Sequence, residues 1–338
     1  MPSPFDPDDL SRFSDFSIHT TPYKTVGSHA ITADVLIPKS LLTSSSPPSP
    51  SARPLLLRFH GGGLVGASSL FPAFFAPWML QLAEREGAVI VSPNYRLLPE
   101  ASVGDVLADV EDVWRWVKGE GEEEGGLARF VEHETKGRVT VDTRRVMTAG
   151  DSAGGYLSVM LALRHPDEIR SATAAYPMLD IRSAHFSTSY AKPMFGLPMQ
   201  PRALYDAHVA AVRSGDKPGV ISADPRCERF ELMFCVPQNG ICSELFPADQ
   251  RAWVPFEAVE DGARLPRGGL FVAHGAGDDV VPVEGSRAFE RLVRERDGEV
   301  RFVLAVREGG HGFDAEASVD DEWMRDGLRG VVQAWLEE

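Results

Sequence analysis

Residues 150–155 read GDSAGG and place Ser152 in the spacing G-x-S-x-G. The segment continues the apolar run 145–150, which predicts a strand, and it leads into the helical pattern 153–164. A sharp strand-to-helix turn projects a serine hydroxyl from the end of a sheet, where it can act as a nucleophile. The other interpretation is a tight turn that only holds its shape or cradles an anion.

A histidine with glycine on both sides, His311, lies in the segment EGGHGF after the last apolar run, 300–306. A serine nucleophile needs a general base within reach of its hydroxyl, and a loop after a strand can bring a histidine there. His311 also takes the last place in the chain order serine, aspartate, histidine. The alternative is a structural or solvated histidine.

Two neighbouring carboxylates, Asp278 and Asp279, occur in the segment HGAGDDVVP after the apolar run 269–275. A carboxylate beside the general base would hold the imidazole in the required tautomer. The residue types by themselves leave open which of the two aspartates has this role.

Three glycines follow a histidine in the segment HGGG, residues 60–63, at the end of the apolar run 55–59. Glycines leave backbone N–H groups uncovered, and such donors can stabilise the oxyanion that forms when an acyl group is attacked. A flexible turn is the alternative interpretation.

The elements that must position these residues are short apolar runs separated by helical patterns. Continuous apolar runs are typical of strands buried on both faces of a parallel sheet. They lie at 55–59, 88–95, 145–150, 171–176, 269–275 and 300–306, and the helical patterns at 71–86, 105–117, 153–164, 283–296 and 322–336. This alternation predicts an α/β fold with a mostly parallel central sheet and helices on both faces.

Other segments depart from this alternation. Residues 16–39 alternate apolar and polar side chains around a central glycine, which predicts an antiparallel hairpin. The Ser/Pro-rich stretch 40–54 predicts a flexible surface loop, and the stretch GEGEEEGG at 119–126 predicts a solvated acidic loop.

A longer irregular stretch, residues 181–263, contains eight prolines and six phenylalanines and no strand-like run. Such a stretch inside a compact domain predicts an inserted cap with its own short helices. We therefore expect a catalytic core from residues 1–180 and 264–338, with 181–263 as the cap. Candidate substrate contacts are Phe195, Met199 and Phe234 of the cap and Leu64 after the glycines; burial of the cap onto the core explains such residues equally well.

Composition excludes several classes of function. Of the 338 residues, 34 are Lys or Arg and 49 are Asp or Glu, so the net charge of −15 argues against nucleic-acid binding and anionic membranes. The acidic N-terminus argues against a secretory signal, and the apolar runs are too short to predict a membrane span.

The cysteines and the absence of cofactor motifs narrow the expected compartment, metal content and cofactors. Three clustered cysteines, Cys227, Cys235 and Cys242, are interpreted as small apolar side chains of a cytoplasmic protein rather than as a disulfide framework or metal site. No dinucleotide or phosphate-binding motif is present, so we expect no cofactor. The expected partner is a small-molecule substrate, bound by a monomer or homodimer.

Taken together, the motifs resemble the α/β-hydrolase fold and, within it, the hormone-sensitive-lipase-like esterases. The resemblance covers about residues 54–180 and 265–338. It rests on HGGG (60–63), YRLLPE (95–100), GDSAGG (150–155), YPMLD (176–180), HGAGDDVVP (274–282) and GGHGF (309–313).

The resemblance implies roles for individual residues. Ser152 would be the nucleophile and His311 the base, and the acid four residues after His274 would be Asp278. The backbone N–H groups of Gly62, Gly63 and Ala153 would form the oxyanion hole. The sequence departs from the family where GDDVVP replaces the common acid loop D-P-L-x-D-E, and residues 1–53 and the cap match no family motif.

These observations predict a serine hydrolase that cleaves a carboxylic ester of a small apolar substrate through an acyl-enzyme. The alternative is a specialised enzyme of a natural-product pathway that uses the same three residues. It would hydrolyse a lactone or thioester, release an acyl group, or catalyse an elimination or cyclisation. A ligand receptor without catalysis is a third interpretation.

Overall fold

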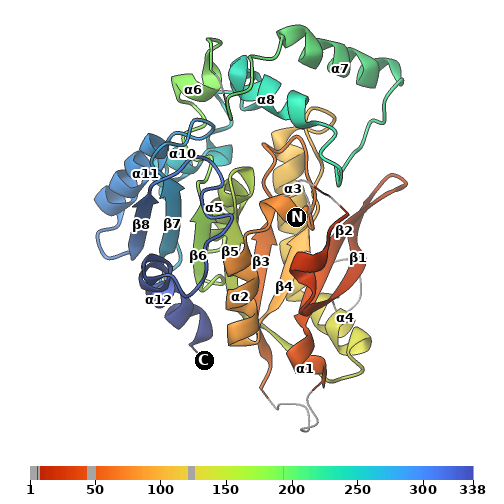
Figure 1. Cartoon of the computed structure of the whole chain (residues 1–338), viewed down its shortest axis with the longest axis vertical. Helices are drawn as coiled ribbons and strands as arrows, with labels where there is room; N and C mark the ends of the chain where they lie inside the picture. The colour runs from red at the N-terminus through yellow and green to blue at the C-terminus, as the bar shows by residue number, and fades with distance from the viewer. Residues whose placement is uncertain (1–5, 7, 44–50, 121–125, 193, 338) are drawn as a thin grey trace.

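A single eight-stranded sheet runs through the molecule in the order β1-β2-β4-β3-β5-β6-β7-β8 (Figure 1). The computed structural model describes residues 6, 8–43, 51–120, 126–192 and 194–337. The strands are β1 (Phe16–Val26), β2 (His29–Pro38), β3 (Arg53–Phe59), β4 (Val89–Pro93), β5 (Val141–Gly150), β6 (Ser171–Ala175), β7 (Leu270–Gly275) and β8 (Phe302–Arg307). β1, β2 and β4 pair antiparallel, and every other pairing is parallel.

Helices cover both faces of this sheet. Those before β6 are α1 (Lys39–Thr43), α2 (Pro77–Glu86), α3 (Val103–Lys118), α4 (Gly126–Glu134) and α5 (Ala153–Arg164). Those after it are α6 (Ala184–Ser187), α7 (Arg202–Ser214), α8 (Phe230–Gln238), α9 (Cys242–Leu245), α10 (Pro255–Glu260), α11 (Val283–Arg296) and α12 (Glu322–Leu336). None of the helices in the described ranges is long and apolar enough to cross a membrane.

The strand β3 shows why the apolar runs are continuous. Leu55, Leu57 and Phe59 belong to the hydrophobic cluster that includes α3, α4, α5 and α11, whereas Leu56 belongs to the cluster with α2 and α12. Successive side chains of a strand point to opposite faces, so a sheet with helices on both faces buries every position. The predicted α/β fold with a mostly parallel sheet is confirmed.

The N-terminal hairpin is also confirmed. β1 and β2 pair from Phe16 with Pro38 to Val26 with His29, and Gly27 turns the chain with φ +61°. Glycine adopts this left-handed conformation without the steric penalty of a Cβ atom.

Three expected segments have different bounds in the described residues. The helix expected over 71–86 begins at Pro77, because proline disfavours helical backbone at the residue before it, and Ala76 is extended with φ −60° and ψ 135°. The loop expected over 40–54 is helical through Thr43 and enters β3 at Arg53; residues 44–50 lie outside the described residues. The acidic stretch 119–126 ends in α4, and its residues 121–125 also lie outside them.

Between β6 and β7 the chain leaves the sheet and forms the helices α6 to α10. We call residues 181–263 the cap segment. Figure 1 shows α6, α7 and α8 above the end of the sheet where the parallel strands finish. Ligands of parallel α/β sheets bind at this carboxyl end, so the cap segment lies over the edge that carries the candidate residues.

Candidate active site

Ser152 lies at the turn between β5 and α5, with φ +54° and ψ −118°. This conformation is strained for a residue with a side chain and costs about 1–3 kcal/mol. The strain is held in place by hydrogen bonds on either side, from Ser152 N to the Ala175 carbonyl at 2.9 Å and from Gly154 N to the Asp151 carbonyl at 2.7 Å.

The two glycines that flank the turn are required by close backbone contacts. A Cβ atom on Gly150 would lie 2.2 Å from the Gly154 carbonyl oxygen, and one on Gly154 would lie 2.1 Å from the Phe59 carbonyl oxygen. Neither backbone neighbour can move aside as a flexible side chain could. The G-x-S-x-G spacing therefore has a steric origin in the packing of α5 against β3 and β5.

His311 lies in the loop after β8 and contacts Asp278, which follows β7. His311 Nδ1 and Asp278 Oδ2 are 2.8 Å apart. The other carboxylate oxygen of Asp278 accepts hydrogen bonds from Val280 N at 2.9 Å and Val281 N at 2.8 Å. Burial opposes ionisation of this carboxyl, but hydrogen bonds from His274 and His311 hold the pKa of Asp278 well below its usual range.

The geometry separates the two aspartates that the sequence left open. Asp278 is buried and faces His311, whereas Asp279 is exposed and accepts a long hydrogen bond of 3.4 Å from Phe195 N. With Nδ1 of His311 donating to Asp278, the Nε2 atom is left as the basic nitrogen of the ring.

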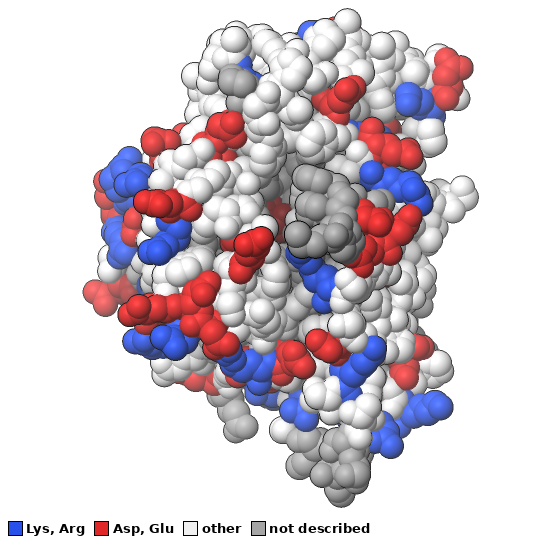
Figure 2. Space-filling view, viewed as in Figure 1, with Lys and Arg blue, Asp and Glu red and all other residues white. Residues whose placement is uncertain are grey.

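Ser152 and His311 line the same cavity, which has a volume of about 250 Å³. Its walls are mostly apolar. Aromatic and aliphatic side chains line it, namely Phe74, Met178, Phe186, Phe195, Met233, Phe234, Val236, Val280 and Val281, together with Cys242. Figure 2 shows acidic and basic residues interspersed over the face seen in Figure 1.

The turn formed by residues 62–66, here called the oxyanion turn after the role proposed for it below, contributes to the same cavity through Gly62 and Gly63. These glycines have φ +101° and +63°, and a Cβ atom on Gly62 would lie 2.2 Å from the Gly66 carbonyl oxygen. Among the described residues, none accepts a backbone hydrogen bond from Gly62 N or Gly63 N. Ala153 is the first residue of α5, where backbone N–H groups have no partner within the helix.

A buried ion pair involves the residue directly before Ser152, and it was not predicted from the sequence. Arg58 Nη2 and Asp151 Oδ1 are 2.6 Å apart, and both side chains are almost inaccessible to solvent. Burial raises the pKa of Asp151 to about 6, although the positive charge of Arg58 opposes the shift. The available signal was a charged residue, Arg58, within the apolar run 55–59.

A second buried carboxyl, Asp314, lines the cavity three residues after His311. Its Oδ2 accepts a hydrogen bond of 2.9 Å from Trp78 Nε1. Burial raises the pKa of Asp314. Nothing in the sequence distinguishes this aspartate from the many acidic residues on the surface, because its burial depends on packing between α2 and the loop after β8.

The four candidate substrate contacts fall into two groups. Phe195 and Phe234 line the cavity, and the Phe195 ring lies 5.7 Å from Phe234 and 5.8 Å from His311 between ring centres. Leu64 is fully buried in the core, where its carbonyl accepts a hydrogen bond from Leu98 N, and Met199 is 37% exposed. The structure does not place these two among the described residues that line the cavity.

The cysteines form no described disulfide: Cys235 and Cys242 are buried and Cys227 is partly buried. Burial raises the pKa of Cys242 to about 12, so its thiol stays protonated. Within the described residues, no group of three His, Cys, Asp or Glu side chains is arranged to hold a metal ion.

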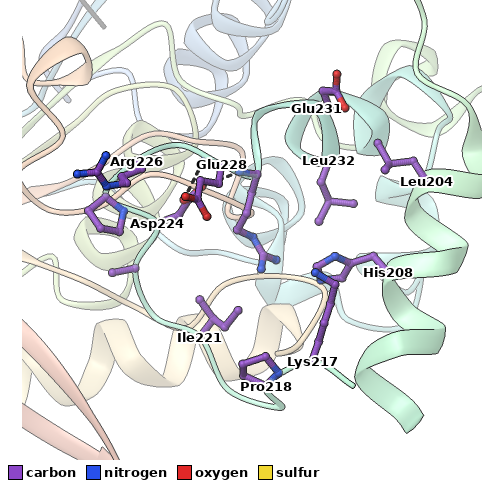
Figure 3. Close-up of a pocket in the computed structure, with 13 residues that line it drawn as sticks. Leu204, His208, Lys217, Pro218, Ile221, Asp224, Arg226, Glu228, Glu231 and Leu232 are labelled. Atoms are coloured by element: carbon purple, nitrogen blue, oxygen red, sulfur yellow. Dashed lines mark hydrogen bonds between the residues drawn. The ribbon is translucent and has the colours of Figure 1, made fainter. Parts of the chain in front are cut away.

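A second cavity, here called the α7 cavity, has a volume of about 500 Å³ and shares no lining residue with the first. Figure 3 shows Leu204 and His208 of α7 on one side, facing Ile221, Pro218 and Lys217 of the segment that follows. Its lining mixes acidic, basic and apolar side chains.

Comparisons with known proteins place the chain in a family. The sequence pattern of the family described as the alpha/beta hydrolase fold matches residues 56–224, which is half of the chain. The protein named "Probable carboxylesterase M8" of Phoma sp. is 27% identical over 328 residues, covering 96% of this chain and 98% of that protein. Arylacetamide deacetylase of Oryctolagus cuniculus is 31% identical over 131 residues, which cover 37% of this chain and 29% of that protein.

A solved structure shows the same fold. The butyrate-bound esterase Est2 of Thermogutta terrifontis matches with a TM-score of 0.55 and 20% identity, covering 95% of this chain and 93% of that one. The sheet, the strand-to-helix turn at Ser152 and these similarities agree with the family resemblance of the sequence motifs. The chain belongs to the α/β hydrolase fold family, as one of its hormone-sensitive-lipase-like members.

Proposed function

We propose that this carboxylic ester hydrolase acts as a serine hydrolase. Ser152 Oγ attacks the ester carbonyl while His311 Nε2 takes the hydroxyl proton, and the alcohol leaves after receiving that proton. Water then attacks the acyl-enzyme, with His311 again as the base, and releases the acid. Asp278 keeps Nδ1 protonated and stabilises the imidazolium.

Backbone donors would stabilise the negative charge on the tetrahedral intermediate. The N–H groups of Gly62 and Gly63 on one side and Ala153 on the other are the proposed oxyanion hole. Such fixed donors cost no reorganisation during the reaction and are worth about 10²–10³ in rate each.

The contact that carries this proposal is the hydrogen bond between His311 Nδ1 and Asp278, together with the shared cavity of His311 and Ser152. Acyl transfer requires a carboxylate with a lowered pKa beside a histidine, and a serine in the same apolar cavity as that histidine. Asp278, His311 and the strained Ser152 have this arrangement.

We also propose that the substrate is a small, mostly apolar ester and that residues 181–263 act as a cap over it. The cavity of about 250 Å³ and its aromatic walls, several of them from the cap segment, support both points. The comparisons do not favour the alternative chemistries on the same residues.

Replacing Ser152 tests the proposal. Ser152→Ala should abolish hydrolysis of p-nitrophenyl acetate and butyrate, and it should abolish covalent labelling by a fluorophosphonate measured by intact-protein mass. Ser243→Ala, at an exposed position of α9, is the matched control and should behave like the wild type. Undiminished labelling of Ser152→Ala would reject Ser152 as the nucleophile.

A further inference from the structure

We propose that Arg229, at the start of α8 in the cap segment, is a positioning residue that holds the oxyanion turn in its active geometry. The proposal rests on the proposed function of Gly62 and Gly63. The cap segment would then complete the catalytic site as well as cover it.

The oxyanion turn is held by hydrogen bonds within its own backbone and by one from the core, where Leu98 N donates to the Leu64 carbonyl at 2.8 Å. The Gly62 carbonyl accepts hydrogen bonds from Val65 N at 2.9 Å and Gly66 N at 3.0 Å. Glycine-rich backbone has many accessible conformations, so further contacts must fix where the Gly62 and Gly63 N–H groups point. The outward carbonyls of the turn are the groups available for such contacts.

Arg229 binds one of these carbonyls directly. Its Nε donates to the Val65 carbonyl at 2.6 Å, and its Nη2 donates to the Leu98 carbonyl at 2.7 Å. The two guanidinium ends also bind Glu100 in a fork, with Nη1 to Oε1 at 2.8 Å and Nη2 to Oε2 at 2.6 Å. One cap side chain thus joins the oxyanion turn to the segment 97–100 of the core.

The surroundings make this contact rigid. The Glu100 side chain is fully buried and that of Arg229 is 10% exposed. The same carboxylate also binds His208 Nε2 of α7, at 2.8 Å from Oε1. Charge-assisted hydrogen bonds in a buried, bidentate geometry are strong and directional, so the guanidinium plane has little freedom.

The backbone of Arg229 is fixed as well. Asp224 accepts hydrogen bonds from Arg229 N at 3.0 Å and Glu228 N at 2.9 Å, and its own N–H donates to the Ala67 carbonyl at 2.8 Å. A Cβ atom on Gly66 would lie only 3.1 Å from the Asp224 carboxylate. The cap segment and the residues that follow the oxyanion turn are therefore in direct contact.

The helix that Arg229 begins reaches the catalytic cavity one turn later. Met233 N donates to the Arg229 carbonyl at 2.8 Å, and Met233 Cγ would lie 3.1 Å from a Cβ atom on Gly63. Met233 also lines the cavity with Ser152. A shift of Arg229 would move both the Val65 carbonyl and the side chain that packs on Gly63.

Lysine cannot replace Arg229, because one ammonium group cannot reach Val65, Leu98 and both oxygens of Glu100 at once. We therefore propose Arg229→Lys and Arg229→Met as test variants. Arg226→Lys and Arg226→Met are the matched controls, since Arg226 lies in the same segment but is exposed and pairs only with Asp8 among the described residues.

The readout is the split between kcat and KM on p-nitrophenyl butyrate, with functional sites counted by phosphonate titration. We expect both Arg229 variants to lose about 10- to 100-fold in kcat, less than the full loss of an oxyanion donor, with KM within about threefold. The inhibition constant of an aryl trifluoromethyl ketone, whose adduct carries an oxyanion, should rise by a similar factor. The Arg226 variants should match the wild type.

Normal kcat per titrated site in Arg229→Lys and Arg229→Met would overturn the proposal. So would an unchanged ketone inhibition constant, since a merely structural defect lowers the number of sites without altering each one. If Arg229→Met does not fold, Glu100→Gln is used instead. This variant weakens the hydrogen bonds that hold the Arg229 guanidinium and should lower kcat by a smaller factor. Activity that survives in Ser152→Ala would instead reject the proposed function.

Discussion

Arg58 and Asp151 form an ion pair in the interior, directly before Ser152, with 2.6 Å between Nη2 and Oδ1. Arg58 is fully buried and also donates to the carbonyls of Ser69 at 3.1 Å and Phe74 at 2.5 Å. The pair thus connects the strand that leads to the oxyanion turn with the turn that carries Ser152.

Breaking this pair from one side should be costly. Arg58→Met leaves the Asp151 carboxylate buried without its cation, and such a loss destabilises proteins by about 3–5 kcal/mol. The double variant Arg58→Met/Asp151→Asn removes both charges and should recover a large part of the loss. Urea unfolding at pH 7 measures both free energies, and equal instability of the single and double variants would contradict the interpretation.

The two aspartates of the loop after β7 should differ strongly in their effect on turnover. Asp278→Asn removes the acceptor of His311 Nδ1 and is expected to lower kcat by about 10³- to 10⁴-fold, because the imidazole loses its required tautomer. Asp279→Asn, at the neighbouring exposed position, serves as the control and should stay within about threefold of the wild type. Comparable losses in both variants would argue against Asp278 as the acid.

The stability of the fold should fall in mild acid because of His60. This histidine is fully buried, its Nδ1 donates to the Gly61 carbonyl at 2.8 Å, and no described group binds its Nε2. Burial lowers the pKa of His60 to about 3. Between that pH and the unfolded value of about 6.5, the unfolded chain binds more protons, so stability present above pH 6.5 is lost as the pH falls.

The test compares the wild type with His60→Asn by urea unfolding from pH 6 to pH 4. The stability advantage of the wild type should shrink by about 1.4 kcal/mol per pH unit. His133→Asn, at an exposed position of α4, should show no such trend relative to the wild type. A constant difference between wild type and His60→Asn would mean that His60 does not resist protonation in the fold.

Phe195 and Met199 provide a matched pair for the substrate pocket. Both side chains are exposed, Phe195 to 50% and Met199 to 37%, but Phe195 lines the cavity beside His311 and Met199 lies outside its lining. Phe195→Ala should raise KM for p-nitrophenyl butyrate by about 3- to 30-fold through lost apolar contact, and Met199→Ala should leave it unchanged. Steady-state kinetics with both variants decide between a pocket wall and a surface residue.

The sheet was predictable because burial on both faces produces an unmistakable pattern. Leu55, Leu56 and Leu57 face opposite helix layers yet are all fully buried, so the whole run is apolar. The positions of Ser152 and His311 followed from the same logic, since Ser152 comes directly after a predicted strand and His311 lies in the loop after the last one. Local steric rules fixed the glycines around Ser152.

What escaped prediction depends on contacts between distant segments. Arg229 and Val65 are bonded although 164 positions separate them, and nothing near Arg229 in the sequence marks it. Leu64, which follows the glycines, was a candidate substrate contact, but the left-handed turn with φ +63° buries it in the core. Side-chain direction in a turn depends on backbone angles that residue types alone do not specify.

The cap segment connects two adjacent parallel strands: the chain leaves the carboxyl end of β6 at Ala175 and returns to the amino end of β7 at Leu270. A chimera in which another cap replaces this one, to change which esters are accepted, must therefore keep a connection from the carboxyl end of the sheet back to the start of β7. The hydrogen bonds from Arg229 to Val65, Leu98 and Glu100 set a condition on such chimeras. A donor cap without an equivalent guanidinium would bring a new pocket but leave the Val65 carbonyl unsupported, and the hybrid would bind its substrate better than it turns it over.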